Sequence, residues 1–187
     1  MAQDETRRRI LEAGAALLME RGGLAFTMEA VARETAVTRQ TVHNQFGTRA
    51  DLLEAVCEHV VNLEAFARMP EVFQQHDPFV GIDLFADIFC RFWETNRLFV
   101  RRMRGLAHAE PELEGVIRLY DERRLSALRG FVERYGPASG ERAARLIRVM
   151  FAMTGFEFFE ALSQDDTPPE SVVSELKQLL RQCIQSL

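Results

Sequence analysis

The sequence has no apolar run long enough to cross a membrane, since none approaches the roughly 18 uncharged apolar residues that a span needs. Its first residues include Asp4, Glu5 and three consecutive arginines, with no apolar core of a signal peptide behind them. Only three cysteines occur, at positions 57, 90 and 183, widely spaced and within apolar patterns. We therefore expect reduced thiols in a cytoplasmic protein, with no disulfide framework and no membrane partner.

Motifs of catalysis and metal binding are missing as well. The sequence has no glycine-rich phosphate loop, no nucleophile elbow and no HExxH motif. Cys57 and His59 stand two residues apart, which is poor geometry for two metal ligands on one helix face. We therefore predict a protein that is not an enzyme and that uses no metal and no cofactor.

Sustained alternation of β-branched residues, which is typical of strands, is also absent. Apolar residues instead recur at helical spacing nearly throughout, and proline and glycine divide the chain into segments of helical length. The predicted fold is all-α with about nine helices. Residues 4–21 and 48–68 are each expected to form one helix, the first ending before Gly22 and Gly23.

The charge is distributed unevenly along the chain. Residues 1–49 carry seven Arg and six acids, a balance of +1. Residues 50–187 carry sixteen Arg plus Lys and twenty-two acids, a balance of −6, so the whole chain has a net charge of −5. This asymmetry permits DNA binding by the first segment without demonstrating it. We therefore expect two domains, residues 1–49 and residues 50–187.

One segment of the first domain, residues 36–46 (AVTRQTVHNQF), is rich in hydrogen-bonding side chains. Val42 and Phe46 stand four residues apart and would anchor one stripe of a helix. The remaining faces would carry Thr38, Arg39, Gln40, Thr41, His43 and Asn44. A short helix, a tight turn and such a polar helix form the pattern of a helix-turn-helix, whose second helix enters the major groove. The alternative is a solvated surface helix, which more often carries long charged residues.

Residues 6–53 resemble the DNA-binding domain of the tetracycline-repressor (TetR) family of bacterial transcription regulators. The matching segments are RRRILEAGAALLMERG, FTMEAVARETAVTRQTVHNQF and GTRADLL. The resemblance implies a homodimeric, all-helical protein whose N-terminal helix-turn-helix binds double-stranded DNA at a palindromic operator. It also implies a C-terminal domain that dimerises through its last two long helices and encloses a pocket for a small-molecule effector. On this resemblance, residues 1–49 are expected to form a helix-turn-helix DNA-binding domain and residues 50–187 a helical effector-binding and dimerisation domain.

The resemblance further implies two groups of DNA contacts. The positions that match phosphate contacts are Thr27, Thr38, Thr41 and Arg49. The base-reading candidates are Arg39, Gln40 and Asn44. The run Arg7–Arg9 would reach the DNA backbone or minor groove, or simply be a solvated end of the chain.

Three residues depart from the family pattern. Ala36 stands where the turn between the helices usually has Gly, and Ala costs ~1 kcal/mol in a left-handed conformation. Gln40 replaces a small residue and is a possible reader of adenine, and His43 replaces a common Tyr as a phosphate or base contact. These departures affect the expected operator sequence more than DNA binding itself.

The second domain contains many Phe and Met residues, which suit a pocket for an apolar or aromatic effector. Most of them, taken singly, are core residues. The candidate effector pocket consists of Phe89, Phe92, Trp93, Phe99, Met103, Met150, Met153, Phe156 and Glu157. Glu157 and Glu160 are unusual in an apolar run. They either lie at an exposed helix end or pair with an arginine such as Arg104, or they recognise a cationic or hydroxylated ligand.

Residues 146–162 are apolar nearly all round, and residues 170–187 carry one broad apolar face. A helix that is apolar on every side must be covered on every side, and a second copy of the chain is the simplest cover. Gly155 would then permit close approach of a helix from that copy. The candidate dimer interface consists of Phe159, Leu162, Val172, Leu176, Leu180 and Ile184.

Together these features predict a DNA-binding transcriptional regulator, a repressor that a small apolar or aromatic effector releases from a palindromic operator. A different class of function remains open: a helical dimeric module that binds another protein, without specific DNA binding.

Overall fold

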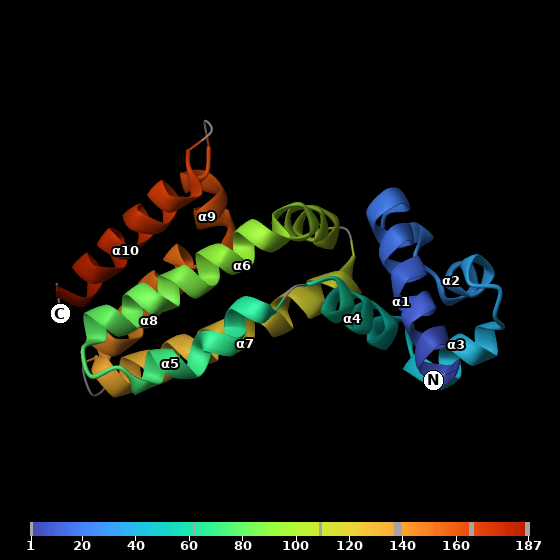
Figure 1. Cartoon of the computed structure of the whole chain (residues 1–187), viewed down its shortest axis with the longest axis horizontal. Helices are drawn as coiled ribbons and strands as arrows, with labels where there is room; N and C mark the ends of the chain where they lie inside the picture. The colour runs from blue at the N-terminus through green and yellow to red at the C-terminus, as the bar shows by residue number, and fades with distance from the viewer. Residues whose placement is uncertain (1, 62, 109, 137–139, 165–166, 186–187) are drawn as a thin grey trace. The chain divides into compact units, whose positions relative to one another are not determined.

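The computed structural model describes residues 2–61, 63–108, 110–136, 140–164 and 167–185. The structure is 86% helical, and the described residues form ten α-helices, two short 3-10 helices and no strand (Figure 1). The predicted all-α class is therefore confirmed, with a helix count close to that expected. None of the described helices combines the length and the apolar character needed to cross a bilayer.

The elements follow one another along the chain as labelled in Figure 1. They are α1 (Ala2–Arg21), η1 (Gly23–Ala25), α2 (Met28–Glu34), α3 (Arg39–Phe46), α4 (Arg49–Val60), η2 (Glu64–Arg68), α5 (Met69–Gln74), α6 (Pro78–Ala107), α7 (Pro111–Tyr135), α8 (Glu141–Met153), α9 (Phe156–Leu162) and α10 (Pro169–Gln185). The last helix was expected to run to the end of the chain, and residues 186–187 lie outside the described residues.

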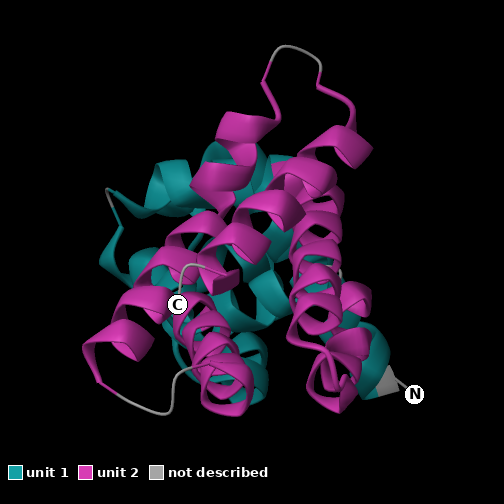
Figure 2. Ribbon diagram, turned by 90° about the vertical axis from the view of Figure 1, so that its left-hand side faces the viewer, with its two compact units in different colours: residues 1–62, 98–119 teal, residues 63–97, 120–187 magenta. Residues whose placement is uncertain are grey.

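The chain divides into two compact units (Figure 2). Unit 1 comprises residues 1–62 and 98–119, and unit 2 comprises residues 63–97 and 120–187. Helices α6 and α7 therefore each contribute a segment to both units. Unit 1 extends past the boundary predicted after residue 49, because α4 packs against α1 and buries its own apolar residues there.

The core of unit 1 forms where α1 crosses α4. Ile10, Leu17 and Leu18 of α1 are buried, as their helical spacing predicted. Between them, Gly14 lies so close to α4 that a Cβ added to it would stand 2.8 Å from Cγ2 of Val56. The absence of a side chain at Gly14 thus sets the distance between these two helices.

The prediction of one helix over residues 48–68 is wrong. α4 ends at Val60, and Val61 has an extended conformation, with φ −71° and ψ 120°. Two consecutive β-branched residues favour such an end, since they have lower helix propensity. The following segment, η2, instead places the ring of Phe66 against Phe89 and Phe92 of α6, with centroids 5.2 and 4.8 Å apart. The packing of Phe66 against α6 within unit 2 therefore favours the end of α4 at Val60 over continuation of the helix.

The expected single helix over residues 146–162 is also interrupted, because α8 ends at Met153 and α9 starts at Phe156. The buried guanidinium of Arg124 lies at this break and donates to the carbonyl of Phe151 at 2.5 Å and to Oγ1 of Thr154 at 3.1 Å. A cation satisfies the unpaired carbonyls at a helix C-terminus well. A Cβ added to Gly155 would lie 3.6 Å from this guanidinium. Such a Cβ would be in ordinary van der Waals contact with Arg124 of the same chain, and the expected approach of a second copy at this residue stays a prediction.

All three cysteines are free thiols. Cys57 and Cys90 are buried, and burial raises the pKa of each to about 12. A thiol with so high a pKa is a poor nucleophile and behaves as a small apolar side chain.

Candidate nucleic-acid interface

Helix α3 is held to unit 1 by the two apolar residues that its sequence predicted. Val42 and Phe46 are both buried, and the guanidinium of Arg7 lies 4.4 Å from the centre of the Phe46 ring. The opposite side of the helix is exposed and carries Arg39, Gln40, His43 and Asn44. The anchoring is therefore confirmed, and the polar side chains are accessible to a ligand.

Threonine side chains start the helices of this region. Oγ1 of Thr38 accepts a hydrogen bond from the backbone N–H of Thr41 at 3.0 Å, and the two threonine hydroxyls lie 2.8 Å apart. Oγ1 of Thr27 likewise accepts from the N–H of Ala30 at 3.1 Å, which caps α2. A hydroxyl that accepts in this way still has its own O–H to donate to a phosphate oxygen.

The turn between α2 and α3 has the left-handed conformation that its position in the motif requires. Ala36 has φ +56° and is the one non-glycine residue with positive φ among the described residues. The preceding carbonyl, of Thr35, accepts a hydrogen bond from Arg9 of α1 at 2.6 Å. Arg8 pairs with Glu5 and Glu12 on its own helix. Two of the three N-terminal arginines, Arg7 and Arg9, thus fasten α1 to the helix-turn-helix.

The three predicted base readers are already ordered by contacts within the motif. Nε2 of Gln40 donates to Oδ1 of Asn44 at 2.7 Å, so these side chains form one array on the exposed face. Arg39 pairs with Glu29 of α2 at 2.6 Å. Such contacts reduce the side-chain entropy that binding must otherwise remove.

His43 is fixed in the same manner. Its Nδ1 lies 2.6 Å from the carbonyl oxygen of Gly47, which only accepts, so Nδ1 carries the proton. Nε2 is consequently the ring nitrogen left for an external partner.

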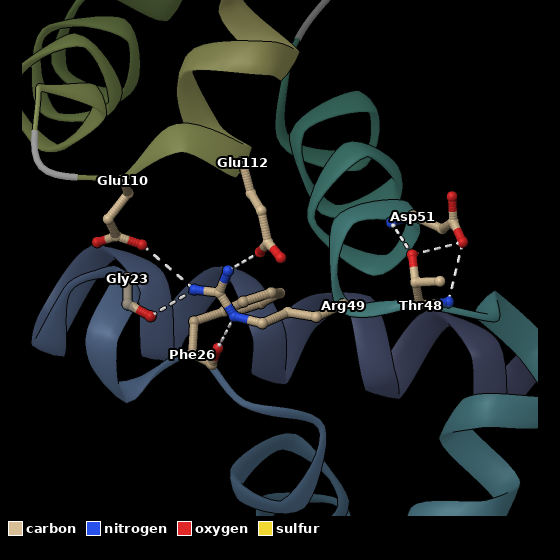
Figure 3. Close-up of polar contacts among 7 residues, drawn as sticks. All are labelled: Gly23, Phe26, Thr48, Arg49, Asp51, Glu110 and Glu112. Carbon is tan, nitrogen blue, oxygen red and sulfur yellow. Dashed lines mark hydrogen bonds and ion pairs between the residues drawn. The ribbon is translucent and has the colours of Figure 1, made fainter.

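Arg49, the first residue of α4, has partners that the sequence analysis did not predict (Figure 3). Its Nε donates to the carbonyl of Phe26 at 2.7 Å and its Nη2 to the carbonyl of Gly23 at 2.8 Å. It also forms ion pairs with Glu110, at 3.2 Å, and with Glu112. All of these residues belong to unit 1.

The residue before Arg49 starts α4 with a reciprocal cap, also drawn in Figure 3. The N–H of Asp51 donates to Oγ1 of Thr48, and Oδ2 of Asp51 accepts from the N–H and the hydroxyl of Thr48 at 2.9 and 2.7 Å. These bonds favour the charged carboxylate and lower the pKa of Asp51 below its usual range.

Most of the residues predicted to line an effector pocket have buried side chains. Phe89, Phe92, Trp93, Met150, Met153 and Phe156 are buried in unit 2, and Phe99 and Met103 are buried in unit 1. The ring of Trp93 packs edge-on against Phe156 at 5.5 Å, and its Nε1 donates to the carbonyl of Thr154 at 3.0 Å. Glu157 is exposed in the first turn of α9. Eight of the nine predicted residues are thus buried side chains, and Glu157 is the exposed one.

Unit 2 also has an open cleft of about 600 Å³, between η2, α6 and the start of α10. Its apolar lining includes Ala65, Ile88, Phe159 and Val173. Its charged lining consists of Glu64, Asp87, Glu94, Glu170, Arg68 and Arg91, so acids outnumber bases. None of the nine residues predicted for the effector pocket is part of this cleft.

Glu160, the second acid in the apolar segment, pairs with an arginine. Nε of Arg97 donates to its carboxylate at 2.5 Å, and Nη2 of the same arginine donates to the carbonyl of Ser163 at 3.2 Å. An arginine partner was one of the explanations considered for this acid, although the residue is Arg97 and not Arg104.

Four of the six residues expected at a dimer interface are buried within the chain itself, which makes them core residues of unit 2. These four are Phe159, Val172, Leu176 and Leu180. Leu162 and Ile184 are partly exposed. Further apolar residues that are at least partly exposed lie on α8 and α10, namely Ile147 and Val149 of α8 and Val173 and Leu179 of α10.

An all-α chain with a capped helix-turn-helix, whose second helix exposes a polar face, is built as a DNA-binding transcriptional regulator. Residues 10–56 match the family described as bacterial regulatory proteins, tetR family. The resemblance predicted from the sequence is thus confirmed, and the N-terminal domain of this protein belongs to the TetR family.

Solved structures extend the similarity of fold to the whole chain. A TetR-family regulator from Syntrophomonas wolfei has a TM-score of 0.73 at 14% identity, covering 96% of this chain and 94% of its own. NalD of Pseudomonas aeruginosa, the secondary repressor of the MexAB-OprM multidrug efflux pump, has a TM-score of 0.73 at 16% identity over 98% of each chain. A transcriptional regulator from Saccharomonospora viridis, in complex with choline, has a TM-score of 0.65 at 17% identity, covering 95% of this chain and 96% of its own. No curated protein matches the sequence at a significant level.

Proposed function

We propose that this protein is a homodimeric repressor that binds a palindromic operator through α3 and that a small effector releases it. The two helix-turn-helix motifs of the dimer would meet half-sites about one helical turn, ~34 Å, apart. The repressor assignment is supported by the similarity of fold to NalD, which is a repressor.

The observation that carries this proposal is the exposed polar face of α3. Gln40 and Asn44 are joined by a hydrogen bond and point away from the buried anchors of the helix. Side-chain amides pair with the N6 and N7 atoms of adenine, so an adenine in each half-site suits this array. Arg39 and His43 flank it as further base or phosphate contacts.

Phosphate contacts would fix the register of the protein on the duplex. Thr27, Thr38 and Thr41 lie at the starts of α2 and α3, where free N–H groups and the helix dipole favour an anion. Arg49 matches a phosphate contact by its position in the family motif, although here it is held by two carboxylates.

The cleft in unit 2 is the place that we propose for the effector. Its apolar floor suits the small, largely apolar compound that the composition predicted, and its excess of acids favours one that carries a positive charge. The choline complex of the regulator from Saccharomonospora viridis supports this chemistry, since choline is a small cation.

The alternative function is a dimeric module that binds another protein and leaves its helix-turn-helix unused. The ordered polar array of α3 favours DNA, because it presents paired amide groups without an apolar patch beside them.

A selection experiment distinguishes the two functions. The full chain is used to enrich duplexes from a random-sequence pool, and binding is measured by fluorescence anisotropy at fixed salt. The proposal predicts an enriched near-palindrome, bound at least about a thousandfold more tightly than a scrambled duplex. Equal binding of both duplexes would contradict the proposal and favour the protein-interaction module.

A further inference from the structure

The guanidinium of Arg49 is surrounded by acceptors of unit 1 (Figure 3). Two backbone carbonyls, of Gly23 and Phe26, and two carboxylates, of Glu110 and Glu112, accept its hydrogen bonds. An arginine side chain has five N–H groups, so these four bonds leave one. The side chain of Arg49 is accordingly only 28% exposed, although it begins a helix at the edge of the helix-turn-helix.

Of the two acidic partners, Glu110 is built into the packing of unit 1, whereas the side chain of Glu112 is 44% exposed. The side chain of Glu110 is 12% exposed, and its carboxylate lies against the Cα of Gly23. A Cβ added to Gly23 would stand 1.8 Å from Oε2 of Glu110, so this position accepts only glycine while the carboxylate remains there. The ring of Phe26 supports the guanidinium, at 5.6 Å from its centre.

The cluster therefore has one positive and two negative groups. A phosphate that approached Arg49 would meet a net negative charge and only one open N–H group, so a bidentate contact with the guanidinium requires it to displace a carboxylate. Carboxylate and phosphate use the same donors of an arginine, which makes the two mutually exclusive at a given N–H group.

We infer that Glu110 and Glu112 compete with DNA phosphate for Arg49 and so limit the affinity of this protein for DNA. This inference rests on the proposed function, and it adds two acids, far from the helix-turn-helix in sequence, as determinants of affinity. In the acid-bound state the guanidinium has no two open N–H groups for a phosphate, so Arg49 contributes little to DNA binding. Replacing both acids by uncharged residues makes the guanidinium available to a phosphate.

The test is a double-mutant cycle on DNA affinity. It uses the full chain, a duplex enriched by the wild-type protein from a random pool, and a scrambled duplex of equal length. Glu110→Gln/Glu112→Gln is expected to raise affinity for both duplexes about tenfold in all, which is about threefold for each of the two Arg49 side chains of a dimer, the effect of one ordinary hydrogen bond each. The slope of log affinity against log salt concentration should also become more negative by about one for each Arg49 that is released.

Arg49→Ala separates this effect from a general loss of negative charge. In the wild-type background it should change affinity less than about twofold, whereas with both acids replaced it should remove the tenfold gain. Glu114→Gln is the control, because Glu114 lies in the first turn of α7, four residues after Glu110, and is not among the described partners of Arg49. It should leave affinity nearly unchanged.

A measurement without DNA tests the cluster itself. Arg49→Ala should lower the urea midpoint of unfolding, because it leaves the mostly buried Glu110 without its cation, and Glu110→Gln should restore part of the loss.

Two results would overturn the inference while leaving the proposed function intact: an equal Arg49→Ala effect in both backgrounds, or an equal gain from Glu114→Gln. Failure of every variant to bind either duplex would instead contradict the proposed function, and the competition with it.

Discussion

At the scale of single residues, the helix-turn-helix could be predicted from the sequence because its contacts are local. The capping bonds of Thr27, Thr38 and Thr48 each reach three residues along the chain, and the anchors Val42 and Phe46 are four apart. The partners of Arg49 could not be predicted in this way, since Glu110 and Glu112 are 61 and 63 residues away. Pairing at that distance depends on tertiary packing that no local pattern encodes.

Ala36→Gly should stabilise the protein. Ala36 has φ +56°, a conformation that costs an alanine about 1–2 kcal/mol, and the higher entropy of glycine in the unfolded chain offsets part of the gain. We expect the free energy of unfolding to rise by about 0.5–1 kcal/mol in urea titrations. Ala16→Gly, at an exposed position within α1, is the control and should lower it by about 1 kcal/mol. A loss of stability in Ala36→Gly would show that the turn is not strained.

At the scale of secondary structure, periodicity located the helices but not all of their ends. The continuous patterns over residues 48–68 and 146–162 each contain a break, after Val60 and after Met153. Both breaks are stabilised by residues distant in sequence. After the first break, Phe66 packs against aromatic rings of α6, and at the second, Arg124 of α7 donates to a carbonyl at the end of α8.

Gly14→Ala should destabilise unit 1 despite the better helix propensity of alanine. The new Cβ would stand 2.8 Å from Cγ2 of the rigid Val56 side chain, so α1 and α4 would have to separate. Overpacking of this kind costs about 1–3 kcal/mol in the free energy of unfolding. Gly115→Ala is the control, because a Cβ there meets nothing within 4 Å, and it should stabilise by about 0.5–1 kcal/mol. Stabilisation by both substitutions would contradict the close crossing.

The cap of α4 predicts a pH dependence of stability. The bonds from Thr48 lower the pKa of Asp51 below its unfolded value, so their contribution is present at neutral pH and is lost as pH falls below about 4. Between pH 6 and pH 3, Asp51→Asn should lose less stability than the wild type. Urea midpoints across this range provide the measurement, and parallel losses in the two proteins would contradict a charged cap.

At the scale of the whole molecule, dimerisation should depend on the partly exposed apolar residues of α8 and α10. Leu179→Glu places a charge on this face and should weaken the dimer roughly thirtyfold or more, with helix content retained. Leu176→Glu instead places a charge in the chain's own core and should unfold unit 2. Sedimentation with circular dichroism separates these outcomes, and exposed Gln178→Glu is the control. An unchanged dimer in Leu179→Glu would place the interface elsewhere.

The central claim is that the exposed face of α3 reads a DNA sequence. The most direct measurement is the affinity of Gln40→Ala, Asn44→Ala and the double variant for the enriched duplex and for duplexes with single base changes. Each substitution should cost about 1–3 kcal/mol and relax preference at one base position. Because the two amides are bonded at 2.7 Å, the double variant should lose less than the sum of the single losses. An unchanged base preference in all three variants would contradict the claim.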